Sequence, residues 1–79
     1  HNLAPPSLQN FNLNEAITQY LNKMQSAHKI SIDFQTFGTA PKFSTEQETA
    51  LYRIVQELVN NIVKHAEATE TLVQLNHTE

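Results

Sequence analysis

Apolar residues recur at intervals of three and four between residues 13 and 27, which places them on one face of an amphipathic helix. Asn12 stands just before this segment, and Glu15 follows three positions later, at the spacing of a capping box. We therefore expect a helix that begins after Asn12 and ends near His28. Its apolar face consists of Leu13, Ala16, Ile17, Tyr20, Leu21, Met24 and Ala27.

Residues 29–37 change to an alternation of apolar and polar side chains, which predicts a half-buried strand. One face of this strand is expected to meet a core and the other to meet water. Gly38 and Pro41 follow the alternating segment and favour a loop. The apolar positions are Ile30, Ile32 and Phe34, and the polar positions are Ser31, Asp33 and Gln35.

The segment that follows this loop predicts a second helix. Ser44 and Gln47 have the spacing of another capping box. Lys64 and His65 fall in the last turn, where basic side chains complement the helix dipole. The apolar residues again form a single stripe at helical spacing. This stripe consists of Leu51, Ile54, Val55, Leu58, Val59, Ile62 and Val63.

Two shorter segments complete the pattern. Residues 71–75 predict a second strand after a linker at 67–70, and Pro5 with Pro6 favours an extended lead-in over residues 1–8. The resulting order is helix, strand, helix, strand. Two strands make a poor sheet by themselves, and each helix has an apolar face that needs cover. We therefore expect an α+β fold, a partial two-layer α/β sandwich that lacks part of its sheet.

Composition limits the classes of function. The 79 residues suffice for one small domain, and 39% apolar with 16% charged residues is ordinary for a globular chain. A net charge of −3 with scattered Lys and Arg does not provide the basic surface that nucleic acid requires. No apolar run approaches the roughly 20 residues of a membrane-spanning helix, and the lack of cysteine excludes disulfides and fits the cytoplasm.

The polar side of the second helix carries the candidate chemistry. At about 100° per residue, Glu57, Asn61 and Lys64 fall within an arc of about 60° opposite the apolar stripe. Asn60 flanks this row, and His65 lies near the border with the apolar face. A carboxylate can accept a proton, a carboxamide oxygen can coordinate Mg²⁺, and an ammonium group can bind phosphate. The row would therefore suit a magnesium triphosphate that lies along the helix.

A simpler interpretation of this row stays open. Glu, Asn and Lys are expected on the wet face of any amphipathic helix, and basic residues near its C-terminus also fit dipole complementarity alone. A zinc site is also disfavoured, because His28, His65 and His77 belong to separate elements without the close spacing of zinc ligands. Spacing alone does not decide between solvated side chains and phosphate chemistry.

Residues 50–66, ALYRIVQELVNNIVKHA, resemble the N box of sensor histidine kinases. They are most similar to the subgroup whose partners are helix-turn-helix response regulators of the nitrate-sensor type. The surroundings agree, since a strand like KISIDFQTFG before this helix and one like TLVQL after it follow the order of that family. The resemblance covers nearly the whole chain, and the N-box segment is its most specific part.

This resemblance implies a fold, a domain organisation and an activity. The fold is the ATPase fold that histidine kinases share with gyrase, MutL and chaperone-type ATPases. Residues 1–10 would form the linker from an upstream dimerising hairpin, and residues 11–79 the first, incomplete portion of the ATP-binding domain. The parent protein would be a homodimer that uses ATP and Mg²⁺ to phosphorylate a histidine and passes the phosphoryl group to a response regulator. This domain would lie in the cytoplasm, whether the parent is a cytoplasmic protein or an inner-membrane sensor.

The resemblance also assigns roles by position. Glu57 matches the general base or polarising group, and Asn61 matches the asparagine that coordinates Mg²⁺. Lys64 and His65 match the pair that contacts phosphate oxygens, and Asn60 neighbours the site.

The later motifs of the family are absent from these 79 residues. A single glycine leaves no Asp-x-Gly-x-Gly segment and no glycine-rich lid, and the phosphoacceptor hairpin is missing as well. We therefore expect the chain alone to bind Mg·ATP poorly, not to autophosphorylate, and to self-associate through its uncovered edges. Two alternatives stay open: a serine kinase of the same fold, and a non-catalytic interaction module.

Overall fold

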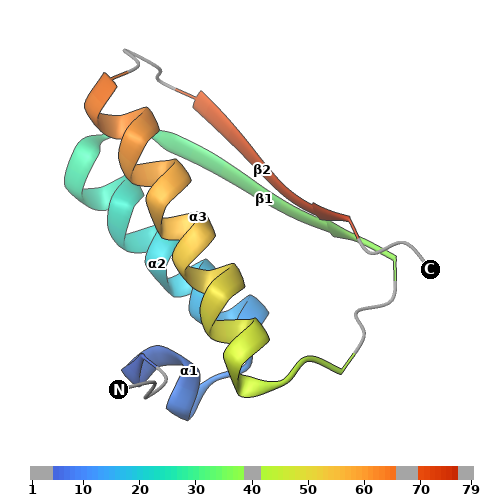
Figure 1. Cartoon of the computed structure of the whole chain (residues 1–79). Coiled ribbons are helices and arrows are strands. Elements are labelled where there is room, and N and C mark those ends of the chain that lie inside the picture. The colour runs from blue at the N-terminus through green and yellow to red at the C-terminus, as the bar shows by residue number, and fades with distance from the viewer. Residues whose placement is uncertain (1–4, 39–41, 66–69, 77–79) are drawn as a thin grey trace.

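A computed structural model shows three helices and two strands that form one small α+β unit (Figure 1). It describes residues 5–38, 42–65 and 70–76. The two long helices lie side by side on one face of a two-stranded sheet, which confirms the predicted partial α/β sandwich. The elements are α1 (Pro6–Asn10), α2 (Leu13–His28), β1 (Ser31–Phe37), α3 (Thr45–His65) and β2 (Glu70–Asn76).

The short helix α1 corrects the expected extended lead-in over residues 1–8. The ring of Pro6 fixes φ near the helical value, and the missing N–H of a proline is not needed at the first position of a helix. The prolines therefore start a helix here, and the N–H groups of Leu8 and Gln9 donate to the carbonyl of Pro5 at 2.9 and 3.2 Å. Residues 1–4 lie outside the described part of the chain.

Helix α2 has the predicted ends. The Glu15 N–H donates to Asn12 Oδ1 at 2.8 Å and the Asn12 N–H donates to Glu15 Oε1 at 3.2 Å, so the capping box is complete. The helix ends at His28 because Lys29 turns the chain with the left-handed angles φ 52° and ψ 43°. A lysine in this region is strained, since its Cβ crowds the following carbonyl.

The two strands are parallel, with Ser31 beside Glu70 and Phe37 beside Asn76. Parallel neighbours need a crossover connection, and α3 supplies it between β1 and β2. Ile30 and Ile32 are buried, as the alternation predicts, while the opposite face of the sheet is more exposed and carries polar side chains together with Leu72 and Phe37. On that face the Gln35 side chain donates to Asp33 Oδ2, and Gln74 donates to Gln35 Oε1.

Helix α3 begins with the second predicted capping box. The Ser44 N–H donates to Gln47 Oε1 at 2.9 Å, and the Gln47 N–H donates to Ser44 Oγ at 3.1 Å. From this start the helix runs without interruption to His65. None of the helices in the described ranges has the length and apolar character needed to cross a bilayer.

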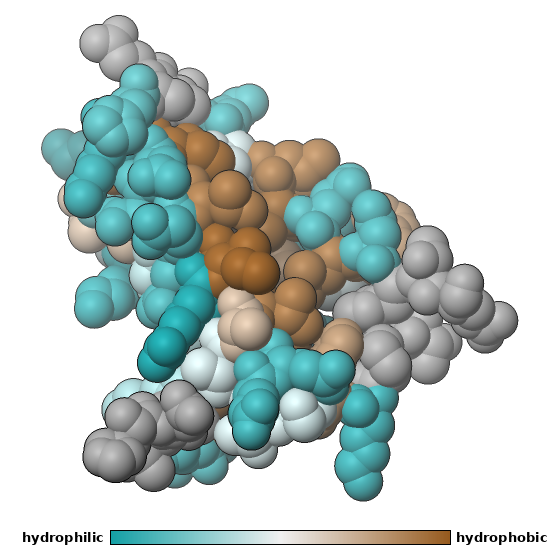
Figure 2. Space-filling model, in the orientation of Figure 1, coloured by the Kyte–Doolittle hydropathy of each residue, from teal (hydrophilic) through white to brown (hydrophobic). Residues whose placement is uncertain are grey.

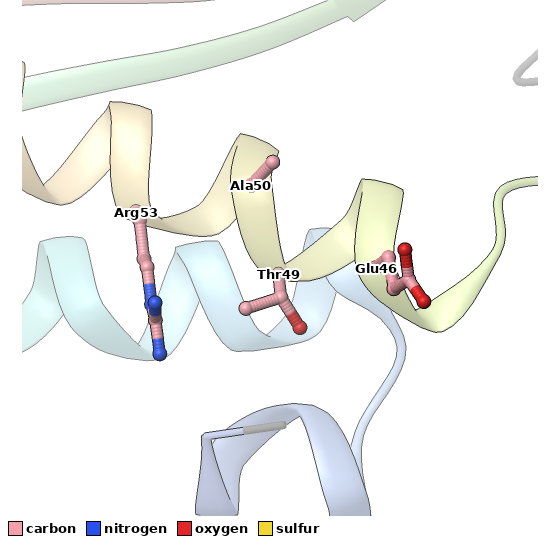
Figure 3. Close-up of a pocket in the computed structure, with 4 residues that line it drawn as sticks. All are labelled: Glu46, Thr49, Ala50 and Arg53. Carbon is pink, nitrogen blue, oxygen red and sulfur yellow. The ribbon is translucent and has the colours of Figure 1, made fainter. Parts of the chain in front are cut away.

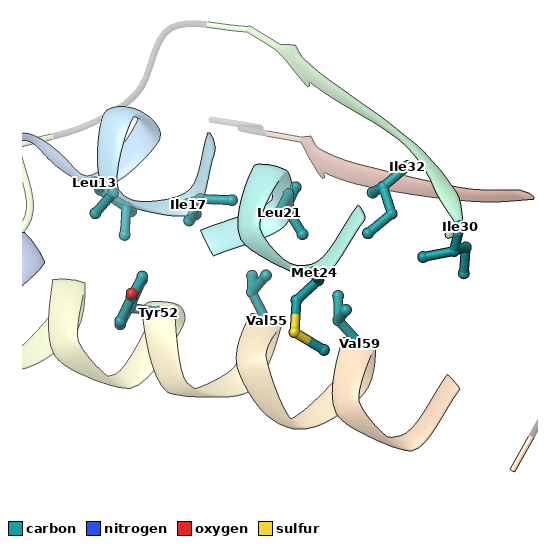
Figure 4. Close-up of a cluster of buried hydrophobic side chains, with 10 residues drawn as sticks. Leu13, Ile17, Leu21, Met24, Ile30, Ile32, Tyr52, Val55 and Val59 are labelled. Atoms are coloured by element: carbon teal, nitrogen blue, oxygen red, sulfur yellow. The ribbon is translucent and has the colours of Figure 1, made fainter. Parts of the chain in front are cut away.

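The core lies where α2, α3 and β1 meet (Figure 4). Ile17 and Val59 are almost completely buried at its centre. Tyr52, which the apolar stripe of the sequence did not include, is also buried, because it lies on the side of α3 that faces α2. The buried residues are Leu13, Ala16, Ile17, Leu21, Met24, Ile30, Ile32, Tyr52, Val55 and Val59.

A pair of tyrosines joins α2 to α3. The rings of Tyr20 and Tyr52 meet edge to face with centroids 6.3 Å apart, and the Tyr20 hydroxyl donates to the carbonyl of Gln56 at 3.3 Å. Burial raises the pKa of the Tyr20 phenol above its ordinary value of 10.0, and the neighbouring Tyr52 adds to this effect. The contact fixes the rotation of α3 at the residue that precedes Glu57.

Replacement of Lys29 by glycine is expected to stabilise the fold by about 0.5–1 kcal/mol, because glycine adopts left-handed angles without a steric penalty. Urea unfolding of the Lys29→Gly chain measures the gain. The same substitution at Lys23, in the exposed interior of α2, is the matched control and should cost about 1 kcal/mol. A loss of stability in Lys29→Gly would contradict the proposed strain.

Removal of the Tyr20 hydroxyl is expected to lower the free energy of unfolding by roughly 0.5–1.5 kcal/mol, because Tyr20→Phe deletes the bond to the Gln56 carbonyl. Tyr52→Phe is the control, since the hydroxyl of Tyr52 makes no hydrogen bond within the described residues, and it should be close to neutral. Chemical denaturation at neutral pH compares the two variants.

The raised pKa of Tyr20 also gives a pH dependence. The folded state holds the phenolic proton more tightly than the unfolded state does, so its contribution to stability is present below pH 10 and is lost as the pH rises through the folded pKa. Tyrosine absorbance should therefore titrate at higher pH in the folded wild-type chain than in the unfolded chain. Tyr20→Phe should reduce that difference, and an unchanged difference would exclude Tyr20 as its source.

Candidate functional site

The predicted polar row lies along the exposed side of the second half of α3. Glu57, Asn61 and Lys64 are all exposed, and none of their side chains makes a hydrogen bond or ion pair within the described residues. Because α3 is continuous through these positions, the row follows one edge of the helix over about 10 Å. These three side chains are therefore free to bind a ligand from solvent.

The two flanking residues lie at the borders of this row. Asn60 is half-buried on the side towards α2, whereas His65 is exposed in the last turn of α3. At about 100° per residue, His65 projects between Ile54 and Leu58, on the opposite side of the row from Asn60. The structure thus brings all five predicted residues to one half of one helix, with Asn60 the least accessible of them.

The backbone beneath the row is held by the core. Val55 and Val59 are buried on the opposite side of α3, and Tyr20 binds the carbonyl of Gln56, one residue before Glu57. Precise positioning of polar groups requires a rigid element under them. The sequence did not predict the Tyr20 contact, although Tyr52 lies three residues before Val55 and so marks the face that meets α2.

A second polar surface precedes the row on the same helix. Glu46, Thr49, Ala50 and Arg53 line a shallow hollow of about 210 Å³ along the first half of α3 (Figure 3). Arg53 is exposed and lies one turn before Glu57, as its position on the polar side predicts. The hollow is open to solvent, and its two charges have opposite signs, so it shows no preference for an anion.

The oxygen donors of the row fit a magnesium ion shared with a phosphate ligand. Mg²⁺ prefers oxygen ligands, keeps several waters and is commonly held by one or two protein groups together with phosphate. Asn61 and Glu57, one turn apart, supply one amide oxygen and one carboxylate. No three His, Asp or Glu side chains gather into a cation site in the described ranges. The donor set therefore fits a metal that arrives with phosphate.

Comparison with known proteins gives two informative relatives. The chain is 34% identical over 76 residues to the oxygen sensor histidine kinase NreB of Staphylococcus carnosus, an alignment that covers 94% of this chain and 22% of that protein. It is 31% identical over 75 residues to the sensor histidine kinase ComP of Bacillus subtilis, which covers 95% of this chain and 10% of that protein.

The chain thus spans about a fifth and a tenth of the length of these two relatives. No family model matches the chain, and no solved structure matches it significantly. The similarity nevertheless extends over almost every element of the fold, with α3 and its polar row inside the aligned length. The chain is therefore homologous to a segment of sensor histidine kinases.

Proposed function

We propose that the full-length protein is a histidine kinase that uses Mg·ATP to phosphorylate one of its own histidines and then transfers the phosphoryl group to a response regulator. The observation that carries this proposal is the exposed row of Glu57, Asn61 and Lys64 on a helix that the core holds in place. Its occurrence in a segment homologous to sensor histidine kinases supports a role in nucleotide binding over a merely solvated surface.

In this proposal each side chain binds a different part of the ligand. Asn61 would hold Mg²⁺ through its amide oxygen, and Glu57 would act as the general base or polarising group for the histidine that accepts the phosphoryl group. Lys64 and His65 would bind phosphate oxygens, while the half-buried Asn60 would contact the ligand from the border of the row. A bound Mg²⁺ neutralises charge on the phosphates.

Phosphoryl transfer depends mainly on positioning and charge neutralisation, so the protein needs fixed groups more than covalent chemistry. Val55 and Val59, which are buried on the opposite side of α3, supply that rigidity. The resemblance of residues 50–66 to the N box further supports the ATPase fold of this family and the nitrate-sensor-like subgroup. The same resemblance supports a cytoplasmic position of this segment and a parent protein that is a homodimer. In the same proposal residues 1–10 link an upstream hairpin to this domain.

Asn61→Ala in the full-length protein is expected to lower the rate of autophosphorylation by about a hundredfold or more, because it removes the proposed Mg²⁺ ligand. Transfer of label from radioactive ATP measures the rate. Asn14→Ala, on the exposed side of α2, is the matched control and should leave the rate unchanged. An active Asn61→Ala kinase would contradict the assignment and favour the non-catalytic interaction module.

The 79-residue chain by itself is expected to bind Mg·ATP only weakly, because the row contacts one side of a ligand and the chain has no glycine-rich segment to enclose it. Isothermal titration with Mg·ATP tests this expectation. Micromolar affinity would show that α3 and its neighbours already form a complete nucleotide site, contrary to the proposal.

A further inference from the structure

Apolar side chains cover more than one side of α3. Val55 and Val59 are buried where α3 meets α2, whereas Ile54 and Leu58 are 54% and 58% exposed, although the apolar stripe of the sequence predicted them as core. Figure 2 shows the exposed apolar area between α3 and β2, with polar side chains at its borders. Burial of apolar surface is non-directional, so it does not by itself select one rotation of α3. A directional contact between the two helices would remove this ambiguity.

The hydroxyl of Tyr20 makes such a contact. It donates to the carbonyl of Gln56 at 3.3 Å and so links a side chain of α2 to the backbone of α3 across 36 positions of the sequence. The ring of Tyr20 is half-buried and packs edge to face on the buried Tyr52, with an interplanar angle of 71°. Because Tyr52 holds the ring, the hydroxyl is presented to α3 at one height along the helix axis.

The acceptor of this bond lies in the turn of α3 where the polar row begins. In a continuous α-helix each N–H donates to the carbonyl four residues earlier, so the Gln56 carbonyl also accepts from the Asn60 N–H. The carbonyl thus accepts one bond along α3 and one from α2. Glu57 follows Gln56 directly, and Asn61 lies five residues after it, about 7.5 Å along the axis. The bond from Tyr20 therefore reaches α3 beside the first members of the row.

The fold does not need this hydroxyl to satisfy a buried group. The Gln56 carbonyl keeps its partner within α3 without it, and a phenylalanine at position 20 would preserve the ring contact with Tyr52. Burial raises the pKa of the Tyr20 phenol, so the hydroxyl keeps its proton and stays a donor at neutral pH. The hydroxyl therefore adds direction to the packed rings, because it specifies the height and rotation of α3 on α2.

We propose that Tyr20 is a positioning residue of the nucleotide site, whose bond to the Gln56 carbonyl sets the register of α3 on α2 and thereby the position of Asn61. This inference rests on the proposed function of the polar row. The helix itself fixes the spacing of Glu57 and Asn61, but it does not fix their place relative to α2 and β1. Mg²⁺ demands near-ideal octahedral geometry, and functional groups must be held within about 0.5 Å of their productive positions. Tyr20 acts through α3 and does not touch the ligand.

Isothermal titration of the full-length protein with Mg·ATP tests this role, because it reports the dissociation constant and the number of sites separately. Tyr20→Phe should raise the dissociation constant about tenfold at an unchanged number of sites, as expected when a group that orients a metal ligand is removed. A loss of folded protein alone would lower the number of sites and leave the dissociation constant unchanged. Tyr52→Phe is the matched control, since it removes the other hydroxyl of the ring pair, and it should bind Mg·ATP like the wild type.

A double substitution tests whether Tyr20 acts through Asn61. Asn61→Ala removes the group that Tyr20 is proposed to position, so in that background Tyr20→Phe should weaken the binding of Mg·ATP by less than about threefold. An effect of about tenfold in both backgrounds would show that Tyr20 acts independently of Asn61 and would overturn the proposal. Circular dichroism verifies that the variants are folded.

The same titrations separate this inference from the proposed function. If Asn61→Ala weakens the binding of Mg·ATP but Tyr20→Phe binds like the wild type, the row keeps its function and the positioning role of Tyr20 is overturned. If Asn61→Ala binds Mg·ATP as tightly as the wild type, the proposed function is overturned and the positioning role with it. Fewer sites at an unchanged dissociation constant in Tyr20→Phe, or equal weakening in Tyr20→Phe and Tyr52→Phe, would overturn the positioning role alone.

Discussion

The packing of α3 against α2 determines which side of α3 faces the core, which faces solvent and which faces β2. Val55, Val59 and Tyr52 are buried along one side of α3 and meet the apolar face of α2. This buried side fixes the rotation of α3 about its own axis. The polar row at 57, 61 and 64 is consequently held in solvent, and the apolar edge at Ile54 and Leu58 is directed to the space beside β2. A rotation of α3 by one residue, about 100°, would move the polar row or the apolar edge towards the buried side of the helix.

Local signals in the sequence predict the elements well because they depend on neighbours in the chain. Asn12 with Glu15, and Ser44 with Gln47, form the two capping boxes in which each side chain bonds a backbone N–H three residues away. The alternation around Ile32 likewise predicts the strand and its buried face. The prediction of an extended lead-in was wrong from Pro6 onward, because a proline disfavours helix in the residue before it but favours the start of a helix at its own position.

The surroundings of each residue were harder to predict, since they depend on elements far away in the sequence. Helical spacing shows that Leu58 and Val59 are both apolar, but only the position of α2 decides that Val59 is buried and Leu58 is exposed. The same reason explains why Tyr52 and its contact with Tyr20 were missed. The position of the row on the exposed side of α3 was predicted correctly because it depends on a single continuous helix, whereas the roles of its members in phosphoryl transfer stay predictions.

The physical separation of the row from the core has a consequence for the interpretation of variants. Glu57, Asn61 and Lys64 are exposed and make no hydrogen bonds within the described residues, so they contribute little to the free energy of folding. Substitutions there should change stability by less than about 0.5 kcal/mol, in contrast to the buried Val59 on the opposite side of the same helix. A loss of function at the row would therefore report on ligand binding or chemistry and not on unfolding. For the same reason, the three polar groups of the row cost the folded state little free energy. The fold by itself does not require these residue types at these positions.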